Sequence, residues 1–205
     1  GMGNVGHKIL KHQLVAEKTP GTEDLSTIAW SGDRGLTLVE QGPFGVIGAV
    51  CPSTNPSETV LCNTMGMLAA GNTVVFAPHP SAKTVSNLAI DMINRASIEV
   101  GGPENIAVAA AEPTMDVSKI IFGHKDISLL CATGGPGVVT TVLSSGKRAM
   151  GAGAGNPPVL VDETANIQKA AEDIVNGATF DNNLPCIAEK EVIAVDMIAD
   201  ELIYY

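Results

Sequence analysis

Residues 45–77 read GVIGAVCPSTNPSETVLCNTMGMLAAGNTVVFA, and this stretch determines the fold class of the chain. Residues 45–51 are a continuous apolar run closed by Pro52, and residues 73–77 are a second such run. Runs of this kind are typical of strands buried on both faces. Between them, residues 58–70 are expected to form a helix that ends at Gly71. A buried strand, a helix and another buried strand predict a parallel crossover unit.

The same alternation continues on both sides of this unit. Further strands are expected at 36–40, 106–111 and 127–132, and helices from Ser81 as N-cap to about residue 100, at 115–122 and after 137. Beyond a glycine-rich stretch the pattern predicts strands at 158–162 and 191–195 with helices at 167–177 and from 196. We therefore predict an α/β fold with a parallel sheet, a domain boundary near residues 150–157, and ligand binding at the carboxyl ends of the strands.

Composition excludes several classes of protein. Of 205 residues, 22 are acidic and 12 basic, a net charge of −10 that lacks the basic surface nucleic-acid binding requires. The longest apolar runs are far shorter than the ~18 residues of a membrane span. No signal-peptide pattern opens the chain. We expect a cytoplasmic α/β protein that binds neither nucleic acid nor membrane.

The four cysteines differ in their sequence surroundings. None has the spacing of a zinc ligand, and we expect no metal site. Cys51, Cys62 and Cys131 lie in apolar patterns and are expected to be buried and structural. Cys186 follows the polar run FDNNLP, a setting that a nucleophilic thiol needs. The pattern alone leaves a structural role for Cys186 open as well.

Two loops that follow predicted strands are candidates for ligand contact. Thr133-Gly134-Gly135-Pro136-Gly137 allows close backbone approach ahead of a helix N-terminus, which suits a phosphate, but it equally suits a tight turn. The loop Pro78-His79-Pro80 holds a histidine between two prolines, and the residue pattern favours a surface turn over a binding loop.

Five segments of the chain together resemble one enzyme family, the CoA-acylating branch of the aldehyde dehydrogenases. They are GPFGVIGAVCPSTNPSE, NTVVFAPHPSAKT, LLCATGGPGVV, SSGKRAMGAGAGNPPVLVDETANI and FDNNLPCIAEKEVIAV. The last segment favours the propionaldehyde and acetaldehyde dehydrogenase type over the bifunctional aldehyde–alcohol type. The resemblance implies a Rossmann-like nucleotide-binding domain over residues 1–153 and the beginning of a catalytic domain over 154–205.

The resemblance also implies roles for individual residues. Cys186 matches the catalytic thiol, which attacks an aldehyde and carries the acyl group as a thioester. The loops Pro78-His79-Pro80 and Thr133-Gly134-Gly135 match those around the nucleotide site, where NAD and then CoA are expected. An amide for the oxyanion is expected in the loop after Pro52, and we choose Asn55, although ungapped alignment to hydrolytic relatives favours Thr54.

Ala152 departs from the wider superfamily. Hydrolytic aldehyde dehydrogenases keep a general-base glutamate at this place, and without it water is a poor nucleophile toward the thioester. We therefore expect NAD-dependent oxidation of a short-chain aldehyde to acyl-CoA. The alternatives are a hydrolytic aldehyde dehydrogenase and a nucleotide-binding fragment without turnover.

The family subunit is more than twice as long as this chain. The resemblance thus implies a fragment that by itself is inactive, and a homo-oligomer for the complete enzyme. Segment 36–41 matches a strand that links domains and subunits. Packaging in a bacterial microcompartment is left open beside a free cytoplasmic location.

Overall fold

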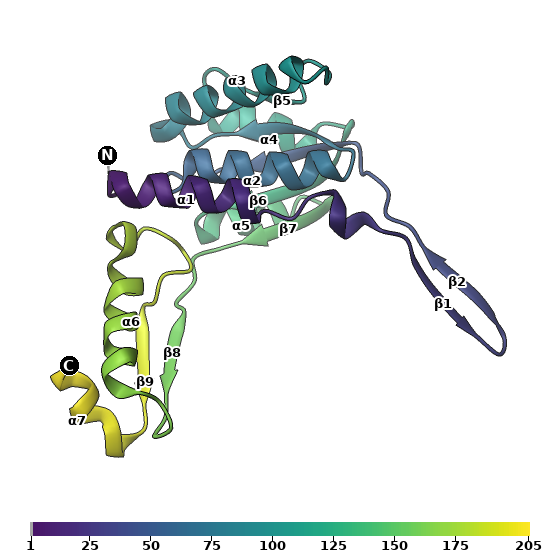
Figure 1. Ribbon diagram of the computed structural model, residues 1–205. Coiled ribbons are helices and arrows are strands. Elements are labelled where there is room, and N and C mark those ends of the chain that lie inside the picture. The colour runs from purple at the N-terminus through teal and green to yellow at the C-terminus, as the bar shows by residue number, and fades with distance from the viewer. Residues whose placement is uncertain (1) are drawn as a thin grey trace. The chain divides into compact units, whose positions relative to one another are not determined.

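The computed structural model describes residues 2–205 (Figure 1). Contacts divide these residues into two units. The larger unit is His12–Gly153, and the smaller one combines residues 2–11 with Ala154–Tyr205. The helix α1 (Val5–Lys18) contributes its first part to the smaller unit and its last part to the larger one. Contacts alone assign no function, so the division into a nucleotide-binding domain and a catalytic part stays a prediction.

A five-stranded parallel sheet forms the centre of the larger unit. Its strand order is β5-β4-β3-β6-β7, with β3 (Val46–Val50), β4 (Thr73–Ala77), β5 (Ala107–Ala109), β6 (Ile127–Thr133) and β7 (Arg148–Ala152). From β3 the chain adds β4 and then β5 toward one edge of the sheet. It then crosses to β6, on the other side of β3, and adds β7 at the opposite edge. This doubly wound, Rossmann-like topology confirms the predicted α/β class.

Helices cover both faces of this sheet. On one face α2 (Pro56–Ala69) and α3 (Lys83–Glu99) contribute Val60 and Ile90 to a buried cluster around Phe76. On the other face α4 (Met115–Gly123) and α5 (Pro136–Leu143) pack onto a cluster around Leu130. Burial of each such large side chain contributes ~1.5–3 kcal/mol, so the apolar runs of the strands and the helices hold each other in place.

Asn72 fixes the entry into the central strand. The side chain is 4% exposed, and its Oδ1 accepts the backbone N–H groups of Phe44 at 2.7 Å and Gly45 at 3.0 Å. Its Nδ2 donates to the carbonyl of Met67 at 3.0 Å. One buried amide thereby joins the end of α2 to the start of β3, because buried backbone groups need partners.

A two-stranded arm and a short helix precede the sheet. The turn η1 (Thr22–Leu25) leads into β1 (Ile28–Gly32), which pairs antiparallel with β2 (Gly35–Val39). Figure 1 shows these two strands as a long hairpin. The sequence predicted β2 but neither β1 nor α1, since polar residues dominate the N-terminal region.

The predicted N-cap at Ser81 is wrong. A short turn, η2 (Pro80–Ala82), comes first, with His79 as its cap, and α3 begins at Lys83. The His79 imidazole Nδ1 accepts the Ser81 N–H at 3.2 Å. The cap thus lies two residues earlier than predicted, because the fixed φ of Pro80 suits a first helical position.

The smaller unit is a short α/β layer. β8 (Pro158–Val161) and β9 (Glu191–Ala194) pair in parallel, and α6 (Ile167–Thr179) and α7 (Asp196–Tyr204) accompany them. The turn η3 (Phe180–Asn183) follows α6 and leads to Cys186.

Candidate active site

The carboxyl edge of the central sheet gathers three of the predicted loops. β3 and β6 are neighbours, yet the chain leaves them toward opposite edges of the sheet, so they flank the topological switch point. The loop with Thr54 and Asn55 follows β3, and the loop with Gly134 and Gly135 follows β6. Ligands of open α/β sheets bind at this crevice.

The β6–α5 loop presents open backbone. Thr133 ends β6, the Gly134 N–H donates to the carbonyl of Ala152 at 3.1 Å, and Gly135 is the N-cap of α5. A Cβ added at Gly135 would meet no atom within 4 Å. The first-turn N–H groups of a helix lack intrahelical partners. Because Pro136 at the first helical position has no N–H, the remaining first-turn donors are the N–H groups of Gly137 and Val138. Their use by a nucleotide phosphate stays a prediction.

The loop after β4 is more ordered than a simple surface turn. Pro78 is buried, whereas His79 and Pro80 are exposed. The His79 imidazole is held by Ser81, whose hydroxyl oxygen lies 2.8 Å from Nδ1. The loop follows β4, which pairs with the switch-point strand β3, so it lies at the carboxyl edge of the sheet.

Thr54 and Asn55 lie side by side before α2. Asn55 occupies the N-cap position without a capping bond from its side chain. Its Nδ2 instead donates to Thr54 Oγ1 at 3.3 Å, and its carbonyl accepts the Thr59 N–H and hydroxyl at 3.1 and 2.7 Å. Both side chains are half-buried, so the choice of Asn55 over Thr54 as oxyanion donor stays a prediction.

Burial separates the cysteines. Cys51 is 2% exposed, and burial, reinforced by the neighbouring Cys131, raises its pKa to about 12. Burial also raises the pKa of the Cys131 thiol. The predicted burial is confirmed for Cys51, whereas Cys131 is only half-buried. The raised pKa values keep both thiols protonated at neutral pH, which is consistent with a structural role.

Cys186 and Cys62 are exposed. For Cys186 this is the setting that the polar loop predicted. For Cys62 the predicted burial is wrong. Val60 and Thr64 of α2 face the sheet, and a residue two positions from each lies on the opposite side of the helix.

Ala152 ends β7 directly beside Thr133, its partner in the sheet. The methyl side chain is exposed and has no group that can accept a proton. A strand position beside the candidate nucleotide loop therefore holds no base.

The larger unit thus brings together the loops with Asn55, Pro78–Pro80 and Thr133–Gly135, whereas Cys186 belongs to the smaller unit. Sequence reasoning missed β7 and the buried Asp181, five residues before Cys186. The only signal for Asp181 was its place in a polar run, which is equally typical of an ordinary loop.

The profile of the aldehyde dehydrogenase family matches residues 4–204. This chain belongs to the aldehyde dehydrogenase family. It is 53% identical over 203 residues to the CoA-propanoylating propanal dehydrogenase of Citrobacter freundii. The alignment covers 99% of this chain and 44% of that protein.

Two solved structures share the fold of this aldehyde dehydrogenase chain over all of its residues. One is a propionaldehyde dehydrogenase from the Clostridium phytofermentans fucose utilisation bacterial microcompartment, 74% identical with a TM-score of 0.95. The other is the Rhodopseudomonas palustris propionaldehyde dehydrogenase with bound propionyl-CoA, 61% identical with a TM-score of 0.94. The chain covers 47% and 45% of these structures. It thus spans somewhat less than half the length of the relatives it matches.

Two further findings concern residues 2–205 only. No three His, Cys, Asp or Glu side chains gather there in a way that could hold a metal ion. None of the helices in that range has the length and apolar character needed to cross a membrane.

Proposed function

We propose that this chain supplies the nucleotide-binding loops and the nucleophile of an enzyme that oxidises a short-chain aldehyde to acyl-CoA with NAD. The observation that carries the proposal is the exposed thiol of Cys186, in a chain 53% identical to a CoA-propanoylating dehydrogenase. The other thiol of comparable exposure, Cys62, lies within a helix and follows no strand end.

Cys186 performs the covalent steps. Its thiolate attacks the aldehyde carbonyl carbon, and the carbonyl oxygen becomes an oxyanion. An amide N–H of Asn55 would stabilise this oxyanion. The C–H bond of the adduct then breaks with its electron pair leaving as hydride, and a thioester on Cys186 remains. NAD, when bound, supplies the hydride acceptor.

The nucleotide is assigned to the two loops at the carboxyl edge. Thr133, Gly134 and Gly135 would receive a phosphate at the N-terminus of α5, and Pro78, His79 and Pro80 would form the neighbouring wall. The open space at Gly135 and the hydrogen-bond contact of His79 with Ser81 support this assignment. The same loops would hold the nucleotide part of CoA.

Ala152 determines which nucleophile resolves the thioester. Water needs a positioned base, whose absence slows its attack by about 10²–10⁴-fold. A CoA thiol is partly ionised at neutral pH and is intrinsically far more nucleophilic than water. The acyl group is therefore expected to leave Cys186 on the sulfur of CoA.

The hairpin of β1 and β2 supports assembly of the complete enzyme into a homo-oligomer. Its large apolar side chains, Ile28, Trp30, Leu36 and Leu38, are all exposed. A second copy of the subunit would cover them. The microcompartment source of the Clostridium phytofermentans relative supports a similar location for this protein.

The test uses a subunit that extends this chain to the full length of its relatives. Wild type, Cys186→Ala, Cys62→Ala and Ala152→Glu are incubated with propionaldehyde, NAD and CoA, and acyl-CoA and free acid are quantified by mass spectrometry. Wild type and Cys62→Ala should form mainly acyl-CoA, and Cys186→Ala should form none above background.

Ala152→Glu should raise the share of free acid. Activity in Cys186→Ala would remove Cys186 as the nucleophile. If free acid were the main wild-type product at saturating CoA, the hydrolytic function would replace the proposal. If the protein bound nucleotide without any turnover, its function would be nucleotide binding alone.

A further inference from the structure

Asp181 is a fully buried carboxylate in the smaller unit, with 0% of its surface exposed. Its Oδ1 accepts the backbone N–H of Asn4 at 2.9 Å. Its Oδ2 accepts from Lys11 Nζ at 2.6 Å and lies 3.0 Å from Lys8 Nζ. Helix α1 and the turn η3, about 170 residues apart in sequence, are therefore joined through one side chain.

The charge on Asp181 is stabilised despite its burial. Burial by itself raises the pKa of the carboxyl, but the hydrogen bonds from Lys11, Lys8 and Asn4 outweigh it and the pKa is lowered. The carboxylate is thus ionised at neutral pH and retains its two ammonium partners.

The backbone at Asp181 is held just as firmly. Its N–H donates to His7 Nδ1 at 2.8 Å, and the His7 ring stacks on Phe180 with centroids 4.5 Å apart. Asp181, Asn182 and Asn183 have φ values of 50°, 55° and 57°. Three consecutive left-handed residues with side chains are costly and persist only when their surroundings determine them.

Side-chain amides hold the rest of this turn. Asn182 Nδ2 donates to the carbonyl of Met2 at 2.9 Å, and Asn183 Nδ2 donates to the carbonyl of Glu189 at 3.1 Å. The Leu184 N–H closes the turn on the Asp181 carbonyl at 3.1 Å. The left-handed segment redirects the chain from the end of α6 toward Cys186.

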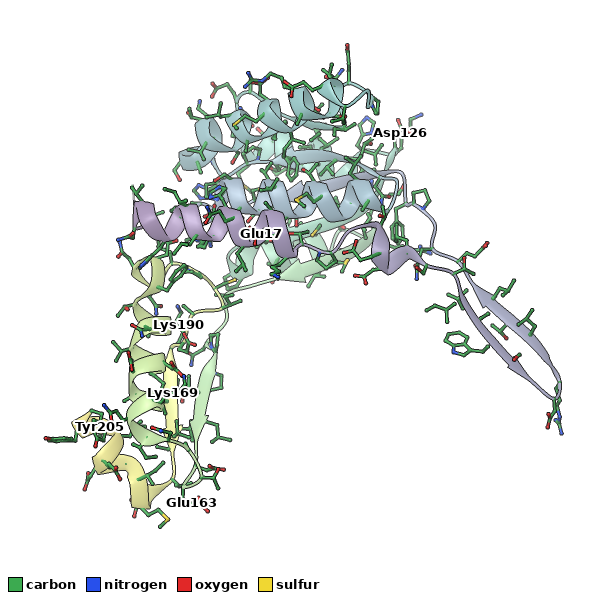
Figure 2. The ribbon with its side chains drawn as sticks, viewed as in Figure 1. Glu17, Asp126, Glu163, Lys169, Lys190 and Tyr205 are labelled. Atoms are coloured by element: carbon green, nitrogen blue, oxygen red, sulfur yellow. The ribbon has the colours of Figure 1, made fainter. Side chains whose placement is uncertain are left out.

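The far side of the Cys186 loop is also anchored. Lys190, which Figure 2 shows where α6 ends and β9 begins, donates to the carbonyls of Asn183 at 3.1 Å and Pro185 at 3.4 Å. The Ala188 N–H donates to the carbonyl of Pro185 at 3.1 Å. The exposed thiol is thus carried on a loop whose two ends are both fixed.

We propose that Asp181 is a positioning residue for Cys186: its buried carboxylate, bound to α1, sets the left-handed turn that presents the thiol to substrate. The inference rests on the proposed function in taking Cys186 as the nucleophile. Asp181 itself contacts no reacting atom and acts through the loop.

Three variants of the full-length enzyme disturb this cluster in different ways. Asp181→Ala removes the carboxylate, and Asp181→Asn keeps its shape and one acceptor oxygen but removes the charge. Gly3→Ala does not change residue 181 itself. Its new Cβ would collide with Asp181 Oδ1 and lie 2.8 Å from Lys8 Cε, so the carboxylate would be displaced. Asp173→Asn is the matched control, because Asp173 is an exposed carboxylate of α6 that pairs with Lys169.

The main readout is the rate at which iodoacetamide alkylates Cys186, divided by the rate at the exposed Cys62 in the same sample. Peptide mass spectrometry gives both rates, below the melting temperature of each variant. We expect this ratio and kcat to fall about tenfold or more in Asp181→Ala and Gly3→Ala, because small misplacements of a reacting group are costly. The loss in Asp181→Asn should be smaller. In all of these variants KM for NAD should stay within about twofold of wild type, and the alkylation ratio and kcat of Asp173→Asn should do the same.

A folded Asp181→Ala or Gly3→Ala enzyme with wild-type ratio and kcat would overturn the proposal. A loss of kcat that follows melting temperature while the ratio stays unchanged would overturn it too, since Asp181 would then act on stability alone. If Asp181→Ala does not fold, the alkylation ratio and kcat of Asp181→Asn and Gly3→Ala test the proposal in its place. The acyl-CoA assay of Cys186→Ala judges the proposed function separately, because the alkylation ratio needs no aldehyde or CoA.

Discussion

Contact with solvent, more than sequence surroundings, separates the thiols of this chain. Cys51 and Cys131 are held among apolar side chains that favour the uncharged form, whereas Cys186 is exposed on an anchored loop. Cys62 shows the limit of reading burial from composition. Its neighbours along α2 are apolar, yet its direction on the helix places it in solvent.

The raised pKa of Cys51 makes a contribution to stability that depends on pH. The thiol pKa rises from 9.0 to about 12 on folding, so the folded protein keeps a proton that the unfolded chain releases above pH 9. This contribution is complete below pH 9 and is lost as pH rises toward 12. Between pH 9 and 10 the loss should be ~1 kcal/mol.

Cys51→Ala should remove this pH dependence while costing about 1–3 kcal/mol at pH 7 from the cavity left behind. Urea unfolding at pH 7, 9 and 10 measures both effects, with Cys62→Ala as the exposed control. If Cys51→Ala and wild type lose stability in parallel above pH 9, the thiol is not the source of the effect.

Strand β7 shows how an element can form without a strong local signal. Its sequence RAMGA has no β-branched residue, and it runs into the glycine-rich stretch. It forms because β6 offers an edge that needs pairing and α5 packs closely on Gly151. A Cβ at Gly151 would lie 2.7 Å from Val139 Cγ1 and 3.4 Å from Leu143 Cδ1.

Gly151→Ala should therefore lower the free energy of unfolding by about 1–3 kcal/mol, because α5 must move or Val139 must leave its rotamer. Gly153→Ala is the matched control, since a Cβ there meets no atom within 4 Å. Chemical denaturation of both variants measures the difference. Equal stability of the two would show that α5 does not pack on β7 as described.

On the scale of the whole molecule, the hairpin is one part of the larger unit whose apolar side chains are exposed. Trp30 and Ile28 share one face of β1, and Leu36 and Leu38 share a face of β2. Ala29 is paired with Leu38 and Trp30 with Thr37, so the two apolar pairs lie on opposite faces of the hairpin. Both faces therefore need a covering surface.

If a second copy covers the hairpin, Trp30 fluorescence of the chain should shift to the blue as protein concentration rises, because Trp30 is its only tryptophan and is 57% exposed. Sedimentation should report the assembly in parallel. Leu38→Asp should weaken association by about tenfold or more, since it removes ~1.5–3 kcal/mol of apolar burial.

Val100→Asp is the control for Leu38→Asp, because Val100 is 86% exposed in the same unit but lies at the end of α3. Assembly that survives Leu38→Asp, or that Val100→Asp disrupts equally, would assign the contact to another surface.

The alternation of apolar runs with helix-forming segments determined the α/β class, four of the five sheet strands and the helices that cover them. Each of these elements buries its own apolar pattern, and the pattern is local. The glycine loop after β6 and the polar loop before Cys186 were likewise visible, because their residue types restrict the backbone directly.

Only the tertiary structure decided which local signals win where they conflict or are weak. Strand β7 depends on its pairing with β6, and the cap at His79 depends on Pro80. Cys62 is exposed because it lies on the side of α2 that faces away from the sheet. The buried Asp181 is the clearest case. Its charge is stabilised by Lys8 and Lys11, and contacts between residues so distant in sequence leave no periodic pattern, because they arise only after the chain has folded.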